Sequence, residues 1–191
     1  MESRKGKIFV ISGPSGVGKT TICKELCSHF SSLKWSVSCT TRPKRDRETE
    51  GQDYYFLSKE EFLERIQNNG FIEYAMVHEN YYGTPKKEIE ECLLKGYDCL
   101  LEIDVQGGHK VKQESQYPSV LIFIAPPDMQ ELLKRLKDRK SDTEETIAKR
   151  IKNAQNEMKE SGFYDHIVVN ENLDKAIEDV KDIVERYSQN T

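Results

Sequence analysis

Eight residues near the N-terminus, Gly13 to Thr20, read GPSGVGKT and match the pattern G-x-x-x-x-G-K-[ST] in full. An apolar stretch precedes them and a helical pattern follows, which is the context that a phosphate-binding loop requires. The glycines let such a loop expose backbone N–H groups to an anion, and the helix adds the positive end of its dipole. Lys19 can reach the β and γ phosphates of a nucleotide, and the Thr20 hydroxyl suits Mg²⁺. We therefore expect a nucleotide here rather than a glycine-rich turn without a ligand, although the pattern does not separate an ATPase, a GTPase, a kinase and a switch protein.

A second segment, TTRPKRDRETEGQDYYFL at 40–57, also has side chains that suit phosphate. Arg42, Lys44, Arg45 and Arg47 lie within six residues of one another. Acidic residues follow directly, so a solvated loop that neutralises its own charge is one interpretation. Two arginines three apart, followed by tyrosines, also suit a forked clamp on a phosphate with O–H donors beside it. The residues alone leave both interpretations open.

Apolar blocks along the chain predict the elements that position these segments. Each of four blocks is followed by a helical pattern, and continuous apolar strands that alternate with helices indicate a parallel sheet covered on both faces. The predicted strands are 7–12, 99–104, 119–125 and 166–170, and we expect a further strand at 36–40 in the same sheet.

The region from about 35 to 94 lacks this rhythm, and we interpret it as an insertion that supplies a second binding surface. We predict short strands at 54–57 and 72–77 and two short helices there. Ser58 and Glu61 have the spacing of a capping box at the start of the first helix. Thr84 before Pro85 predicts the cap of the second helix.

The bulk properties limit the class of protein. The 191 residues fit one domain, and a net charge of −4 argues against a general nucleic-acid binder. The five cysteines fit no zinc or haem spacing and favour a reducing compartment. The first residues do not form a signal peptide, and the longest apolar run, 120–125, is far short of a membrane span. We expect a cytoplasmic protein that contacts no membrane.

The 40–57 segment is also the point at which the chain resembles a known family. It contains T-T-R, two residues, a basic residue, and then Glu, Gly, Tyr and Phe at the spacing found in guanylate kinases. A phosphate loop is common, whereas the ordered set of further matches, which covers nearly the whole chain, is highly specific. These matches are GFIEYA at 70–75, NYYGTP at 80–85, LEIDVQG at 101–107, IFIAPP at 122–127, KRLKDR at 134–139 and TEETIAKRI at 143–151.

The resemblance implies an α/β fold of the P-loop nucleoside monophosphate kinase type, a parallel sheet flanked by helices with an inserted GMP-binding subdomain and a mobile lid. It implies one domain, with its core at about 1–34, 95–134 and 151–191, the insertion at about 35–94 and the lid at about 135–150. The implied reaction is direct in-line transfer of the γ-phosphoryl group of ATP to GMP, giving ADP and GDP, in guanine nucleotide synthesis and GMP recycling. The expected partners are ATP with Mg²⁺, GMP and dGMP, and no nucleic acid. The oligomeric state is left open.

The resemblance also implies the site residues. Glu73 accepts hydrogen bonds from N1–H and the N2 amino group of guanine, which adenine lacks, and an unpaired buried carboxylate would reject adenine. The implied ATP site comprises Gly13, Pro14, Ser15, Gly16, Val17, Gly18, Lys19, Thr20, Thr21 and Asn170. The implied GMP site comprises Ser38, Arg42, Arg45, Tyr54, Glu73, Tyr82, Thr84 and Asp104. The implied catalytic residues are Lys19, Arg135, Arg139 and Arg150, and the implied metal-site residues are Thr20 and, through water, Glu102.

Other interpretations stay open at this point. A guanylate-kinase-like module that binds partners without catalysis is one, although such a module is expected to lose the loop lysine or the lid arginines. A kinase for another nucleoside monophosphate and an RNA-binding role for the basic loop are the others. The chain departs from the common family pattern at Pro43–Lys44, Arg47, Tyr74, Thr84, Glu102 and Lys140. These departures bear on loop and lid motion more than on the identity of the reaction.

Overall fold

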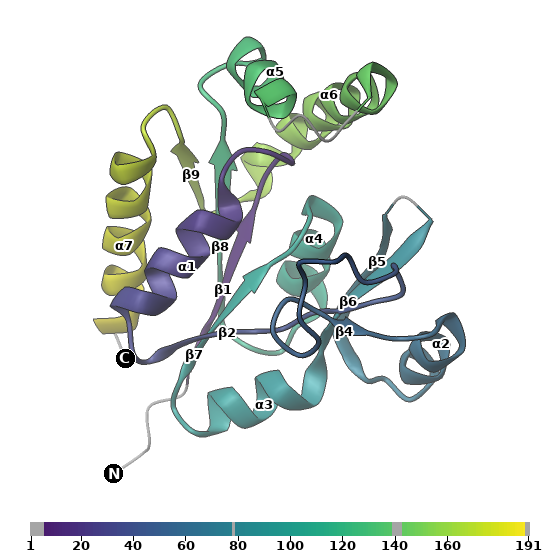
Figure 1. The fold of residues 1–191 in the computed structure, drawn as a ribbon. Helices are drawn as coiled ribbons and strands as arrows, with labels where there is room; N and C mark the ends of the chain where they lie inside the picture. The colour runs from purple at the N-terminus through teal and green to yellow at the C-terminus, as the bar shows by residue number, and fades with distance from the viewer. Residues whose placement is uncertain (1–5, 78, 139–142, 190–191) are drawn as a thin grey trace.

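Five parallel strands at the centre of the molecule form one sheet in the order β2-β7-β1-β8-β9 (Figure 1). The computed structural model describes residues 6–77, 79–138 and 143–189. Within them, the strands of this sheet are β1 (Ile8–Ser12), β2 (Leu33–Trp35), β7 (Asp98–Glu102), β8 (Ser119–Ala125) and β9 (His166–Val169). All of their pairings are parallel. The expected parallel sheet is therefore confirmed.

Helices cover both faces of this sheet, which explains why its strands are apolar throughout. Successive side chains of a strand point to opposite faces. Phe9 and Ile11 of β1 accordingly belong to one buried cluster with helices α1 (Lys19–His29) and α7 (Leu173–Gln189). The opposite face of the sheet packs against α3 (Lys86–Leu94) and α4 (Val105–Glu114).

A smaller sheet, in the order β4-β3-β6-β5, projects from the large one. Its strands are β3 (Cys39–Thr40), β4 (Tyr55–Phe56), β5 (Phe71–Val77) and β6 (Asn80–Pro85), and α2 (Lys59–Gln67) packs against it. Its core is a stack of rings, because Phe62 of α2 lies 4.4 Å from Phe71 and 5.3 Å from Tyr81.

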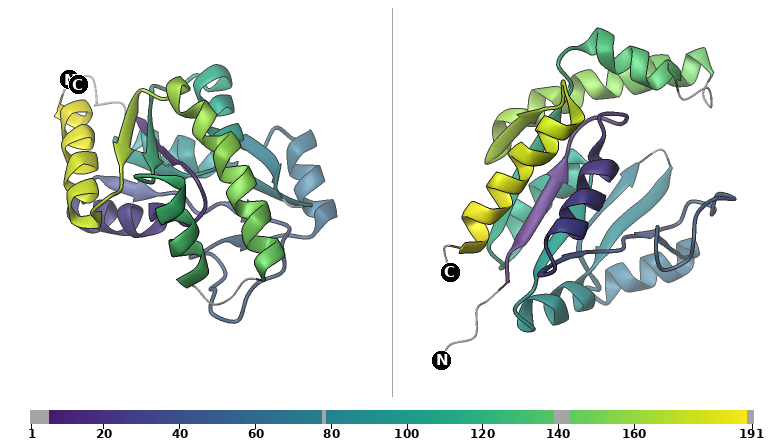
Figure 2. Two further views of the ribbon diagram at one scale, coloured as in Figure 1. Left: turned by 90° about the horizontal axis from the view of Figure 1, so that it is seen from above. Right: turned by 60° about the vertical axis from the view of Figure 1, so that its left-hand side comes forward.

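Two further helices, α5 (Met129–Asp138) and α6 (Glu144–Lys159), pack on each other through Leu132, Leu136 and Ala154. A short 3-10 helix, Glu160–Phe163, follows α6. Figure 2 shows this helix pair and the small sheet as separate projections from the large sheet.

Two of the expectations for these elements are wrong, and one strand was not expected. The predicted strand at 36–40 does not join the parallel sheet. Instead Leu33–Trp35 forms its edge, and Cys39–Thr40 pairs with β6 and β4. The unexpected strand is β6, in which Gly83 and Pro85 are poor strand residues. Glycine is favoured at 83 because a Cβ there would lie only 3.0 Å from Phe62 and Phe71. Thr84 is not the cap of α3; Pro85 holds the N-cap position.

Among the described residues, no helix combines the length and the apolar composition needed to cross a membrane.

The capping box at the start of α2 is confirmed. The Glu61 backbone N–H donates to Ser58 Oγ at 3.1 Å, and the Ser58 N–H donates to Glu61 Oε2 at 2.7 Å. We predict that Ser58→Ala lowers the free energy of unfolding by about 1 kcal/mol, because one N–H of the first turn loses its partner. Urea denaturation measures the change, and Lys59→Ala, at the exposed neighbouring position, is the control. Equal effects in the two variants would contradict the role of the cap.

Candidate active site

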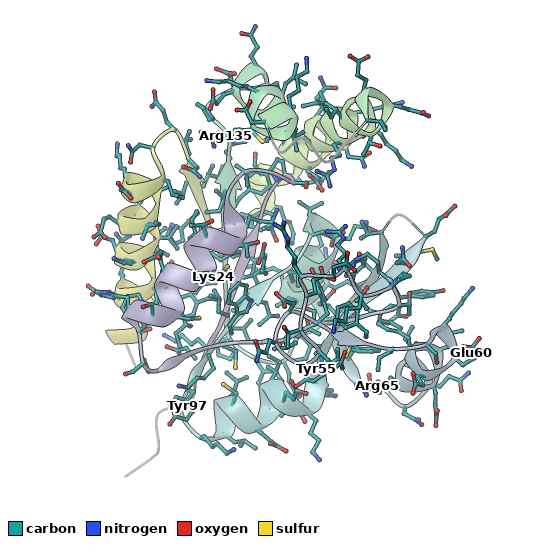
Figure 3. The ribbon with its side chains drawn as sticks, in the orientation of Figure 1. Lys24, Tyr55, Glu60, Arg65, Tyr97 and Arg135 are labelled. Atoms are coloured by element: carbon teal, nitrogen blue, oxygen red, sulfur yellow. The ribbon has the colours of Figure 1, made fainter. Side chains whose placement is uncertain are left out.

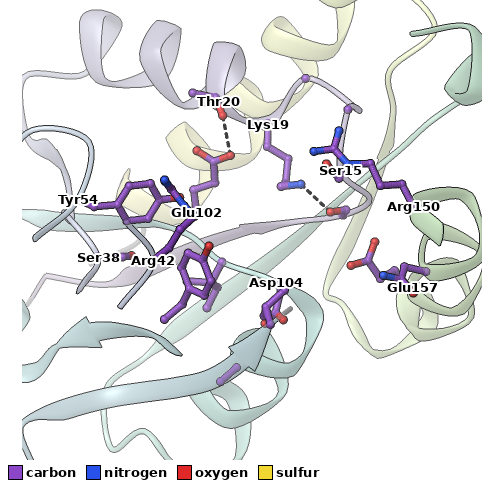
Figure 4. A pocket seen from close by; sticks show the side chains of 18 of the residues that line it. Ser15, Lys19, Thr20, Ser38, Arg42, Tyr54, Glu102, Asp104, Arg150 and Glu157 are labelled. Carbon is purple, nitrogen blue, oxygen red and sulfur yellow. Dashed lines mark hydrogen bonds between the residues drawn. The ribbon is translucent and has the colours of Figure 1, made fainter. Parts of the chain in front are cut away.

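A cavity of about 880 Å³ lies among the loop after β1, the small sheet and α6 (Figure 4). Most of the residues expected to bind nucleotide line it. They are Gly13, Ser15, Gly16, Gly18, Lys19, Thr20, Thr21, Ser38, Arg42, Arg45, Tyr54, Glu73, Tyr82, Glu102, Asp104 and Arg150. The phosphate loop, the 35–94 region and α6 therefore face one cavity.

The loop between β1 and α1 has the backbone that a phosphate nest needs. Gly13 and Gly18 have φ values of 140° and 100°, which residues with a side chain rarely adopt. A Cβ on Gly13 would lie 2.2 Å from the Ile124 carbonyl oxygen, so no other residue fits without moving β8. The Lys19 ammonium donates to the carbonyl oxygens of Gly13 at 2.6 Å and Pro14 at 3.0 Å. Burial lowers the pKa of Lys19.

Thr20 and Glu102 meet at the edge of the cavity. The Thr20 hydroxyl donates to Glu102 Oε1 at 2.8 Å. A hydroxyl and a carboxylate are oxygen ligands of the kind that Mg²⁺ prefers, and Mg²⁺ commonly keeps several waters. Among the described residues, no group of three His, Cys, Asp or Glu side chains could hold a metal by itself. The pair thus fits a magnesium ion that also depends on water and phosphate oxygens.

Asn170 follows β9 and supports the phosphate loop from behind. Its Nδ2 donates to the Val17 carbonyl oxygen at 2.7 Å, and the residue is 3% exposed. A Cβ on Gly18 would lie 2.8 Å from this Nδ2. Asn170, Pro14 and Val17 are absent from the cavity lining. The contact of Asn170 is therefore with the loop backbone, and its expected contact with a base stays a prediction.

The basic loop neutralises part of its own charge, as one of the two interpretations of its sequence held, but the pairing of Arg42 with Glu48 was not predicted. Arg42 donates from Nη2 to Glu48 Oε1 at 2.7 Å and from Nη1 to Glu48 Oε2 at 3.0 Å. The Arg45 backbone N–H also donates to Glu48 Oε2, at 2.9 Å. The Glu48 hydrogen bond raises the pKa of Arg42, and the Arg42 hydrogen bond lowers the pKa of Glu48.

Two tyrosines complete this side of the cavity. The ring of Tyr54 lies 5.9 Å from that of Tyr82, and the Arg42 guanidinium lies 5.4 Å from the centre of the Tyr54 ring. Figure 4 shows Arg42 and Tyr54 facing the space that Lys19 borders from the other side. A planar cation that now holds two carboxylate oxygens can hold two phosphate oxygens in the same way.

Glu73 lies on β5 at the floor of the cavity and is 5% exposed. The Thr84 hydroxyl donates to its Oε1 at 2.6 Å. Burial raises the pKa of Glu73 to about 7, although the Thr84 bond opposes this shift. Gly107 makes room for the carboxylate, because a Cβ there would lie 2.7 Å from Glu73 Oε2.

Asp104 lies nearby, but not on a strand as expected. Strand β7 ends at Glu102, and Asp104 is the N-cap of α4, where its Oδ1 accepts from the Gly107 N–H at 2.9 Å. The charge of Asp104 also raises the pKa of Glu73. The two carboxyl groups are therefore held by different elements, Asp104 by the start of α4 and Glu73 by β5 of the small sheet.

Of the expected catalytic arginines that the structure describes, one lines the cavity and one does not. Arg150 of α6 lines the cavity. Arg135 lies on α5 outside the cavity lining, where its Nε donates to Glu131 Oε1 at 3.0 Å (Figure 3). Arg139 lies outside the residues that the structure describes.

Sequence analysis predicted only Arg150 on the face of α6 that borders the cavity. Thr146, Lys149, Arg150, Asn153 and Glu157 all line the cavity. Their spacing of three and four residues is the helical signal that would have found them. Burial raises the pKa of Glu157 to about 7, and the charge of Lys19 opposes this shift.

Comparisons with known proteins agree on one family. The family model described as Guanylate kinase matches residues 5–187. A guanylate kinase of Geobacter metallireducens is 45% identical over 95% of this chain and 89% of its own length. One of Clostridium tetani is 47% identical over 94% of this chain and 86% of its own. The crystal structure of guanylate kinase from Anaplasma phagocytophilum superposes with a TM-score of 0.83 at 36% identity, covering 100% of this chain and 90% of that one.

Asn170 gives a test of the loop's support. We predict that Asn170→Ala lowers the free energy of unfolding by about 1–3 kcal/mol, because the buried Val17 carbonyl loses its donor. The variant should also bind a nucleoside triphosphate more weakly, since the loop is less restrained. Denaturant unfolding and a nucleotide titration measure both effects. Asn68→Ala, at an exposed position after α2, should change neither. Wild-type binding by Asn170→Ala would show that the loop holds its shape without this bond.

Proposed function

Because the chain belongs to the guanylate kinase family, we propose that it transfers the γ-phosphoryl group of ATP to GMP and releases ADP and GDP. One observation carries this proposal: a buried carboxylate, Glu73, faces the same cavity as an intact phosphate loop. The loop suits the phosphates of the donor, and the carboxylate suits the base of a guanine acceptor.

The recognition of guanine follows from hydrogen-bond chemistry. An ionised Glu73 accepts from N1–H and the N2 amino group, which lie on one edge of guanine. Adenine offers neither donor there, so its binding would leave a buried charge without a partner. Thr84 already holds Oε1 of Glu73 and so fixes the direction of the carboxylate. We assign Ser38 and Asp104, which also line the cavity, to the other polar atoms of the base.

The acceptor phosphate fits beside Arg42 and Arg45. In the structure Glu48 holds Arg42 with two oxygens and accepts the Arg45 N–H. A phosphate can take the place of this carboxylate without a new cationic group, and the Tyr54 and Tyr82 hydroxyls can donate to it. We propose that GMP binding replaces the contact between Arg42 and Glu48.

The transfer step requires charge neutralisation more than a chemical catalyst. The phosphate of GMP is mostly ionised near neutral pH, so no general base and no side-chain nucleophile are needed. Lys19 lines the cavity at the phosphate loop, and Arg150 lines it from α6. We assign both side chains to the charge of the migrating phosphoryl group. We assign Thr20 and Glu102 to Mg²⁺, which neutralises phosphate charge when bound. Closure of the cavity excludes water and so prevents hydrolysis.

Arg135 and Arg139 belong to the same proposal as lid arginines. Arg135 would leave Glu131 and turn toward the phosphates when the lid closes. We keep the boundaries expected from the sequence: a GMP-binding insertion at about 35–94, a lid at about 135–150, and the remainder as core. The small sheet and the α5–α6 pair support this division, because they project separately from the large sheet.

The binding-module alternative loses its support at the phosphate loop. A module that only docks a partner does not require a phosphate-loop lysine and an arginine that line one cavity. Lys19 and Arg150 both line the cavity here. We further propose that dGMP is accepted and that the protein works in the cytoplasm, since its five cysteines are free thiols.

The decisive experiment measures ADP release from ATP and Mg²⁺ with GMP, AMP, CMP, UMP or no acceptor. We expect ADP with GMP alone among the four ribonucleotides. ADP release without an acceptor would identify an ATPase instead. Binding of GMP without ADP release would restore the binding module.

Glu73→Gln tests the base-reading role. We predict a loss of about 10- to 100-fold in kcat/KM for GMP, because one hydrogen bond to a charged group is lost. The affinity for ATP should not change. Glu64→Gln, at an exposed position on α2, is the matched control. Full GMP turnover by Glu73→Gln would exclude the assignment of guanine to this carboxylate.

The pH dependence gives a second readout of Glu73. Its pKa is about 7, so the charged form that accepts both guanine donors increases as the pH rises through that value. We predict that kcat/KM for GMP rises with pH and then levels off, and that Glu73→Gln loses this component. The comparison between variants is needed because Glu157 and the GMP phosphate ionise in the same range. Stability should change in the opposite direction. The carboxyl binds its proton more tightly in the folded state, so unfolding free energy falls as the pH rises from about 4.5 to about 7.

A further inference from the structure

Two cysteines outside the cavity lie against each other under the large sheet. Cys92 of α3 is half-buried, and Cys99 of β7 is 1% exposed. Both belong to the cluster between α3 and the sheet. Cys99 Sγ lies 3.9 Å from the Ile89 carbonyl oxygen, and Cys92 Sγ lies 3.8 Å from that of Asp98. Each thiol thus contacts the backbone of the other's element, which brings the two side chains together in one cluster.

The surroundings of Cys92 favour its thiolate. Cys99 lowers the pKa of Cys92, and the charges of Lys34 and Lys95 act in the same direction, while burial and the charge of Asp98 oppose them. The other thiols differ. Burial raises the pKa of Cys23, Cys27 and Cys39, and the contact with Cys92 together with burial raises that of Cys99. A partly exposed thiol among cations, with a second thiol buried behind it, has the arrangement of an attacking and a resolving cysteine.

We propose that Cys92 and Cys99 form a thiol–disulfide exchange site that reacts with small disulfides such as oxidised glutathione. The Cys92 thiolate attacks one sulfur of the disulfide, which forms a mixed disulfide on Cys92 and releases one thiolate. The Cys99 thiol then attacks the Cys92 sulfur and passes its proton to the departing thiolate. This step forms the Cys92–Cys99 disulfide and releases the second thiol. The protein loses two electrons and two protons, and the small disulfide gains them.

The position of this pair links it to the cavity. Helix α3 continues directly from β6, which carries Tyr82 and Thr84, and β7 ends at Glu102. A Cys92–Cys99 disulfide would therefore link α3, which follows the small sheet, to strand β7 of the large sheet. The site does not depend on the proposed phosphoryl transfer, since neither cysteine lines the cavity.

Peptide mapping tests the proposal directly. The reduced full-length chain is treated with oxidised glutathione, quenched with acid, alkylated at its remaining thiols and digested with trypsin. Cleavage after Lys95 separates the two cysteines, so the disulfide joins two peptides that are otherwise free. We expect this joined pair, with Cys23, Cys27 and Cys39 alkylated. With Cys99→Ala, glutathione should stay on Cys92; with Cys92→Ala, Cys99 should stay reduced. Cys27→Ala, at another half-buried thiol, should leave the crosslink unchanged.

A rate measurement on the unaltered chain covers the case in which a variant fails to fold. Under limiting iodoacetamide, Cys92 should react about tenfold faster than Cys27, because both thiols are half-buried and a larger fraction of Cys92 is thiolate. Reaction of Cys92 no faster than Cys27 would overturn the proposal. A mixed disulfide that persists on Cys92 of the unaltered chain, with no joined peptides, would overturn it as well.

Discussion

Charged groups that face an enclosed space must have partners, because an unpaired charge away from bulk water is costly. In this chain the partners come from the protein itself. Lys19 donates to two loop carbonyls, Arg42 to Glu48, and Glu102 accepts from the Thr20 hydroxyl. The partners of Lys19 and Arg42 occupy positions that ligand oxygens could take. Binding then exchanges one partner for another, and the two cationic groups are already oriented when the ligand arrives. The same constraint explains Glu73, whose burial raises its pKa although Thr84 donates to it.

The sequence predicted the elements that carry continuous apolar runs or local motifs. Strand 119–125 was predicted to the residue, because both of its faces are covered and its apolar run has sharp ends. Strands of the small sheet were harder. Cys39–Thr40 is a two-residue strand whose pairing depends on β6, far along the chain, and β6 itself contains Gly83 and Pro85. Neither carries a local signal strong enough to specify its partner, since the sheet forms around the ring stack of Phe62.

The site was predictable to the extent that its residues belong to continuous motifs. The phosphate loop could be placed from eight residues, whereas pairs between elements could not. The Arg42–Glu48 pair lies in a segment whose acidic residues suggested a solvated loop that neutralises its own charge, and the sequence did not indicate which acid pairs with which arginine. Asp104 was expected on a strand because Glu102 is, yet the strand ends first and the aspartate caps a helix. The polar face of α6 was present in the sequence as a three-and-four spacing, which the apolar face of the same helix obscured.

Gly107 lies where the two sheets approach each other. It belongs to α4, which packs on the large sheet, while Glu73 belongs to the small one, and the gap between them has no room for a Cβ. A side chain at 107 would therefore displace the Glu73 carboxylate, and a bulkier residue at 73 would press on α4. Substitutions at the two positions are expected to depend on each other. One contact thus sets both the direction of the carboxylate proposed to read the base and the joint between the small sheet and α4.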